Sequence, residues 1–136
     1  MTQTNTKQED THALDQAKAQ LLSIIEMVQA LADADDDDAR DEARQHIQED
    51  PLCVEVRTGW IAAGSLDTAS PEEYRILLCT GGPAVQIIGA LDQDNQPETA
   101  TLQYQDWFIP WADYKATAVE TEALLIYARE FYYGEG

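Results

Sequence analysis

The stretch from Tyr74 to Leu91 decides the fold of this chain, and it reads YRILLCT, then GGP, then AVQIIGAL. Two apolar runs of strand length flank the turn at 81–83, and glycine and proline are favoured in such turns. This pattern predicts a β-hairpin at the centre of a sheet, buried on at least one face. In the second run, Gly89 predicts either a bulge or a close approach of two backbones.

The rest of the chain predicts helices that pack on this hairpin and strands that extend its sheet. We expect helices at 10–32 and 38–48, strands at 52–60 and 99–107, one helical turn at 70–73, and a C-terminal helix that opens with a Thr117/Glu120 capping box. The first helix carries an apolar stripe that suits either the core or a dimer seam. The order ααββββα predicts an α+β fold, with a four-stranded antiparallel meander, two N-terminal helices and one C-terminal helix.

The chain length fits a single domain with its own core. The chain has 136 residues, which is enough to bury a stable core without disulfide bonds or a structural metal. We expect a polar tail at 1–9 and one α+β domain at 10–136, with its helical part at 10–50 and the sheet and last helix at 51–136. In the final helix, the expected buried residues are Val119, Ala123, Leu124, Tyr127, Ala128 and Phe131, and Gly134 is expected to end it.

The charge is strongly unbalanced. Twenty-six Asp and Glu face eight Lys and Arg, which gives a formal net charge of -18 and a pI near 4.1. Such a surface repels nucleic acids and anionic membranes, and it attracts basic partners at long range in a salt-dependent way. We therefore expect no direct nucleic-acid binding and no membrane binding. Solubility or adaptation to high salt is the alternative explanation of the charge.

The cysteines and the N-terminal residues bear on the compartment. Cys53 and Cys79 each fall inside an expected strand, which predicts buried free thiols and not a disulfide scaffold. The sequence MTQTNTKQED has no apolar segment of the kind found in signal peptides, and no apolar run approaches the roughly 20 residues that span a bilayer. The expectation is a cytoplasmic protein.

An acidic segment at 33–50 is the first candidate site. Its nine acids are Asp33, Asp35, Asp36, Asp37, Asp38, Asp41, Glu42, Glu49 and Asp50. A calcium loop starting at Asp35 fails, because Arg40 stands where the loop needs glycine and His46 where it needs glutamate. We expect no metal here. The segment is either a solvated acidic face or an array of carboxylates that occupies the basic groove of a nucleic-acid-binding protein in place of phosphates.

An aromatic block at 104–114 is the second candidate. It includes Asp106, Trp107, Trp111 and Tyr114. Aromatic residues at the end of a strand commonly complete a core, but this block could also form a binding edge with an apolar body and a polar rim. The two histidines, His12 and His46, form no metal-binding or triad pattern with other residues. We therefore expect no catalytic residues and no cofactor.

Three blocks of sequence carry a resemblance: EEYRILLCTGGPAVQIIGALD, YQDWFIPW and LLIYAREFYYGEG. Through them, residues 50–136 resemble a family of short uncharacterised proteins from bacterial chromosomes and mobile elements. That resemblance implies no activity. By size and charge alone, the chain is also similar to the phage anti-restriction and anti-CRISPR proteins that imitate DNA.

These observations favour a non-enzymatic, acidic protein-binding module whose partner is a basic nucleic-acid-binding protein or complex. The leading hypothesis is an inhibitor that presents residues 33–50 to that partner as a mimic of nucleic acid. The first alternative is a small-ligand-binding protein or enzyme that uses Asp106, Trp107 and Trp111. The second is a structural homodimer that pairs through the first helix.

Overall fold

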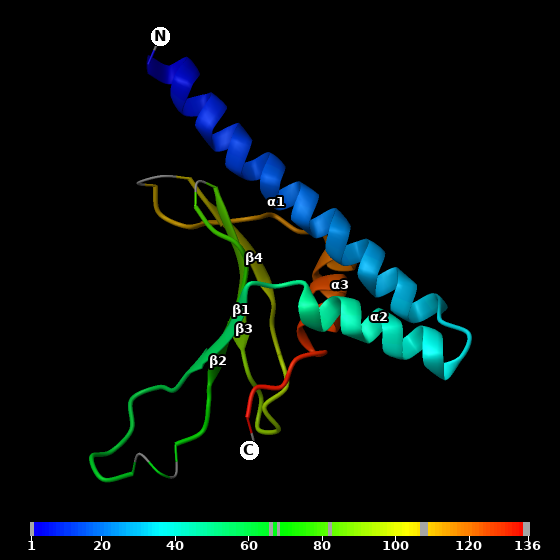
Figure 1. Cartoon of the computed structure of the whole chain (residues 1–136). Coiled ribbons are helices and arrows are strands. Elements are labelled where there is room, and N and C mark those ends of the chain that lie inside the picture. The colour runs from blue at the N-terminus through cyan, green and yellow to red at the C-terminus, as the bar shows by residue number, and fades with distance from the viewer. Residues whose placement is uncertain (1, 66, 68, 82, 107–108, 135–136) are drawn as a thin grey trace.

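The computed structural model describes residues 2–65, 67, 69–81, 83–106 and 109–134, with side chains from His12 onward. Figure 1 shows three helices on one face of a twisted antiparallel sheet, so the fold is α+β as the sequence predicts. The elements in chain order are α1 (Thr2–Asp33), α2 (Asp37–Glu49), β1 (Cys53–Arg57), β2 (Glu73–Cys79), β3 (Ala84–Ala90), β4 (Thr101–Gln105), β5 (Ala112–Asp113) and α3 (Ala118–Ala128).

The sheet is a meander of five strands, in the order β1-β2-β3-β4-β5, and every neighbouring pair is antiparallel. The predicted hairpin forms its centre, where Ile76 pairs with Ile87 and Ile87 pairs with Leu102. The predicted count of four strands is wrong. The fifth, β5, has only two residues, which pair with Gln103 and Tyr104; so short a strand leaves no alternating pattern in the sequence.

The helix boundaries differ from the prediction mainly at the N-terminus. α1 begins at Thr2 and continues through the segment expected to be a polar tail, because the polar residues there do not break a helix. α2 begins after Asp36, whose carboxylate accepts a hydrogen bond from the Ala39 N–H. Residues 70–73, all of them described, form no helical turn; the chain runs directly into β2.

The C-terminal helix opens as the sequence predicts. Thr117 accepts from the Glu120 N–H, and the Glu120 carboxylate accepts from the Thr117 N–H, so both halves of the capping box form. The helix ends at Ala128, before Gly134. Val119, the second residue of the helix, is 76% exposed, which contradicts its predicted place in the buried stripe.

One hydrophobic core joins the helices to the sheet. Its most deeply buried residues come from α1, α2, the three central strands and α3; they include Leu21, Ile24, Ile47, Ile76, Val85, Ile87, Leu102, Leu124 and Tyr127. The apolar stripe of α1 is therefore packed within the chain, against α2, α3 and the sheet. Because this stripe is buried within the chain, little of its apolar surface is available to pair with a second copy.

β1 is an edge strand that lies largely outside this core. Val54 is half-buried, whereas Leu52 and Val56 are exposed, although the three alternate along the sequence. The chain after β1 projects away from the helices in Figure 1, and Trp60 in that connection is fully exposed. Cys53 is exposed and Cys79 half-buried, so the expectation of two buried thiols is wrong; the helices do not cover the edge strand.

Gly89 marks a close approach of two segments, as expected. A Cβ built on this residue would overlap the carbonyl oxygen of Thr99 and would lie 2.7 Å from Cε1 of Tyr74. The Tyr74 hydroxyl donates a hydrogen bond to the same Thr99 carbonyl, at 2.6 Å. Burial raises the pKa of this tyrosine, which keeps the hydroxyl protonated as a donor. The glycine thus allows the chain entering β4 to pack onto β3.

Candidate functional sites

The acidic segment runs from Asp33, the last residue of α1, through α2 to Asp50, which caps the C-terminal end of α2. All nine carboxylates predicted from the sequence are exposed. Of these nine carboxylates, only that of Asp37 lies within ion-pair distance of a described cationic side chain, with its Oδ1 3.5 Å from Nη1 of Arg40. Arg44 pairs instead with Glu130, which follows α3. The segment therefore keeps most of its negative charge.

Two of these aspartates also have structural roles. Asp36 caps α2, and its negative charge is favourable at the positive end of the helix dipole. Asp50 accepts a hydrogen bond from the Tyr127 hydroxyl at 2.7 Å, which ties the end of α2 to α3. On its inner side, α2 buries Ala43 and Ile47. The helix therefore holds its outer carboxylates on a fixed support.

Within the part of the chain that the structure describes, no three His, Cys, Asp or Glu side chains converge in a way that could hold a metal ion. No described helix combines the length and apolar character needed to cross a bilayer.

The aromatic block divides between core and surface. Tyr114 packs against the core while remaining half-buried. Trp111 lines a cavity. Asp106 is half-buried and does not line that cavity, while Trp107 falls outside the described residues. The block therefore does not converge on one site in the described structure.

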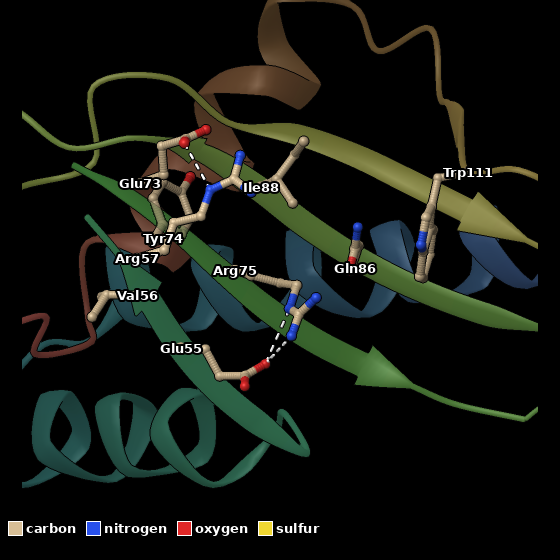
Figure 2. A pocket seen from close by; sticks show the side chains of 9 residues that line it. All are labelled: Glu55, Val56, Arg57, Glu73, Tyr74, Arg75, Gln86, Ile88 and Trp111. Carbon is tan, nitrogen blue, oxygen red and sulfur yellow. Dashed lines mark hydrogen bonds and ion pairs between the residues drawn. The ribbon is translucent and has the colours of Figure 1, made fainter. Parts of the chain in front are cut away.

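The cavity, which we call the sheet-face pocket, lies on the sheet face opposite the helices. It encloses about 350 Å³ and is lined by Glu55, Val56, Arg57, Glu73, Tyr74, Arg75, Gln86, Ile88 and Trp111. This volume falls at the lower end of the range of small-molecule sites, roughly 300–1,000 Å³. Figure 2 shows the polar lining on three adjacent strands, with Trp111 at one side. Sequence analysis found only Trp111 of these residues.

Two cross-strand ion pairs neutralise the charges of the pocket. Arg75 Nε lies 3.0 Å from Glu55 Oε1, and Arg57 Nε lies 2.8 Å from Glu73 Oε1. Both pairs join residues that stand directly opposite one another on β1 and β2. Hydrogen bonding to Arg75 lowers the pKa of Glu55, and hydrogen bonding to Arg57 lowers the pKa of Glu73.

Replacing Arg75 tests the first of these pairs. In Arg75→Met, we expect the pKa of Glu55 to rise toward its ordinary value of 4.5, because its hydrogen-bond donor and the nearby positive charge are lost. The pKa of Glu73 stays depressed, since Arg57 remains. Both pKa values are measured by NMR titration of the carboxyl carbons. An unchanged pKa of Glu55 in the variant would show that the pair does not form.

The lowered pKa values also set the sign of a pH effect on folding. A carboxyl whose pKa is lower in the folded state stabilises the fold above its unfolded pKa. For Glu55 and Glu73, the contribution is complete above about pH 4.5 and is lost as the pH falls through the lowered values.

A row of polar side chains crosses the same face of the sheet. Asp113, Gln103 and Gln86 occupy paired positions on β5, β4 and β3. Gln103 Nε2 donates to Asp113 Oδ1 at 2.8 Å, and Gln86 Nε2 donates to Gln103 Oε1 at 2.8 Å. The Gln86 side chain is only 5% exposed, and its Oε1 has no hydrogen-bond partner in the described structure. A buried acceptor without a partner costs about 1–3 kcal/mol.

Sequence reasoning missed this row because it depends on the register of three strands. One signal was present in the sequence: Gln86 interrupts the otherwise apolar run AVQIIGAL.

Comparison of the chain with protein-family models, with curated proteins and with solved structures gives no significant match.

Proposed function

We propose that this chain is a non-enzymatic, acidic protein-binding module that inhibits a nucleic-acid-binding protein by occupying its basic groove. An anti-restriction or anti-CRISPR protein acts in this way. The observation that carries the proposal is the exposed acidic segment at 33–50, in which a single carboxylate of nine has a cationic partner among the described side chains.

The spacing of the charges on α2 supports this function. Five acids, Asp37, Asp38, Asp41, Glu42 and Glu49, fall within the 13 residues of the helix. At 1.5 Å per residue, they span about 18 Å, or on average about 4.5 Å per interval, and four of the five fall within the first roughly 8 Å. One DNA strand carries one charge per roughly 3.4 Å along the helix axis. Lysines and arginines arranged for phosphates therefore meet a similar linear density of charge.

The rigidity of the segment adds to this argument. Ile47 is fully buried in the core, Tyr127 donates to Asp50, and Gln48 donates to the Glu130 carbonyl at 3.3 Å. These contacts fix α2 before a partner binds, which lowers the entropy lost on association. On the opposite face of the sheet, the two arginine–glutamate pairs reduce the charge. The helical layer is therefore the face offered to a basic partner.

The test is competition with DNA. The probes are two purified proteins, an RNA-guided nuclease complex and a restriction enzyme, each bound to fluorescent double-stranded DNA. We expect the chain to displace DNA from at least one of them, with an affinity that falls steeply as salt rises. No displacement from either protein at low salt would contradict the proposal.

A matched pair of variants separates a defined site from net charge. The site variant changes Asp37, Asp38, Asp41 and Glu42 to their amides and keeps Asp36, which caps α2. The control changes Asp15, Glu26, Asp94 and Glu122, four acids that are exposed elsewhere. We expect the site variant to lose at least about tenfold in affinity and the control less than about threefold. Equal losses would mean that total charge, and not the segment, attracts the partner.

A further inference from the structure

We propose that the sheet-face pocket binds a small, uncharged, planar ligand that carries a ring amide, such as a nucleobase without its phosphate. In this site, the Gln86 carbonyl oxygen accepts a hydrogen bond from the ligand N–H. The site is distinct from the acidic segment, which lies on the helical layer, and its occupant differs from the proposed protein partner.

Asp113 fixes the orientation of both glutamine amides. An ionised carboxylate only accepts hydrogen bonds, so Gln103 must turn its NH₂ group toward Asp113. Its oxygen then faces Gln86, which must in turn present its own NH₂ group. The Gln86 oxygen is left facing away from β4, without a partner in the described structure. A buried acceptor in this position calls for a donor from outside the chain.

In Figure 2, Gln86 lies between the Arg75 guanidinium and the Trp111 ring, and all three line the pocket. Arg75 uses its Nε and one terminal nitrogen for Glu55, so other N–H groups of its five remain to donate. A ring amide offers the matching pair of groups, an N–H for Gln86 and a carbonyl oxygen for Arg75.

The shape and the charge of the sheet-face pocket also favour a neutral planar ligand. Trp111 provides a flat apolar wall and Ile88 an aliphatic contact, which suit the faces of a planar ring. Both glutamates of the pocket are already paired with arginines, so the pocket itself has no uncompensated charge. The net charge of -18 opposes any anionic ligand. A neutral ring is therefore favoured over a nucleotide.

The test uses three probes on the full chain. Uracil and 2-pyridone carry a ring N–H, whereas 1,3-dimethyluracil keeps the ring and its carbonyls but has no N–H to donate. NMR titration follows the side-chain amide signals of Gln86 and the indole N–H of Trp111. We expect uracil or 2-pyridone to shift both signals with a Kd of about millimolar, as suits so small a ligand. Dimethyluracil binds about tenfold more weakly.

Uridine monophosphate distinguishes a free base from a nucleotide as the natural source of the ring. We expect it to bind more weakly than uracil, because the acidic surface repels its phosphate. Tighter binding by the nucleotide would overturn the choice of a neutral ligand.

Two variants test the roles of the residues. Gln86→Met keeps the length of the side chain but removes the acceptor, and we expect it to abolish the preference for uracil over dimethyluracil. In Asp113→Asn, the new side chain can donate as well as accept, so both glutamine amides can turn and present the Gln86 NH₂ group to the pocket. The preference for uracil over dimethyluracil then weakens or reverses. Asp94→Asn, an exposed change outside the sheet, leaves it unaltered.

Three further results would overturn the proposal. The first is that neither ring amide shifts the Gln86 signals at 10 mM, on the order of ten times the expected Kd, in which case water alone satisfies the oxygen. The second is equal binding of uracil and dimethyluracil to the unmodified chain. The third is an unchanged preference in a folded Gln86→Met variant. Loss of DNA competition in the preceding experiment would leave all three results unaffected, because that experiment concerns the opposite layer.

Discussion

Replacing Gly89 with alanine lowers the free energy of unfolding by about 3 kcal/mol or more, at the upper end of the cost of overpacking a core. The added methyl group overlaps a backbone carbonyl, that of Thr99, and lies close to the ring of Tyr74. A shift of Thr99 that relieved the overlap would disturb the hydrogen bond that its carbonyl accepts from the Tyr74 hydroxyl. Thermal unfolding followed by circular dichroism would show a fall in Tm of about 10 °C.

Gly59→Ala is the matched control. A Cβ at this position would overlap the carboxylate of Glu72, which is the exposed end of a flexible side chain and can rotate away. We expect a change of less than about 0.5 kcal/mol. If the two alanine variants unfolded at the same temperature, the close packing of residue 99 on β3 would be wrong.

Truncating Leu21 to alanine lowers the free energy of unfolding by about 3–4 kcal/mol, as expected for a buried leucine that leaves a cavity. Leu21 is 2% exposed, in the core between α1 and the rest of the chain. Urea unfolding would show a lower midpoint with an unchanged slope, since the surface exposed on unfolding is nearly the same.

The neighbouring residue provides the comparison for Leu21. Leu22 has the same side chain on the same helix but is 62% exposed. We expect Leu22→Ala to cost less than about 0.5 kcal/mol. A large loss in Leu22→Ala, together with a midpoint that rises with protein concentration, would instead identify the outer face of α1 as the seam of a dimer.

Local signals predicted the elements that are held by local contacts. The turn at 81–83 lies between two apolar runs, and the hairpin formed there. The Thr117/Glu120 capping box depends on residues three apart, and it formed as expected. By contrast, β5 has only two residues and is defined by its partner β4, so no local pattern announces it.

Burial proved harder to predict than secondary structure. β1 alternates apolar and polar residues like an inner strand, yet Val56 is exposed because the strand lies at the edge of the sheet. The sequence located the acidic segment because its charge is contiguous. It could not locate the sheet-face pocket, whose residues come from β1, β2, β3 and the segment before β5. Only the strand register brings Gln86, Gln103 and Asp113 into one row.

The packing of α1 against α3 has a consequence for synthesis on the ribosome. The first helix ends at Asp33, whereas the last helix ends at Ala128, and the two pack together. Synthesis proceeds at roughly 5–20 residues per second, so the apolar side of α1 stays exposed for about 5–20 s before α3 has been synthesised and can pack on it. During that interval, α2 and its acids are the next residues to appear. Their mutual repulsion opposes association between nascent chains at the stage when α1 is most exposed.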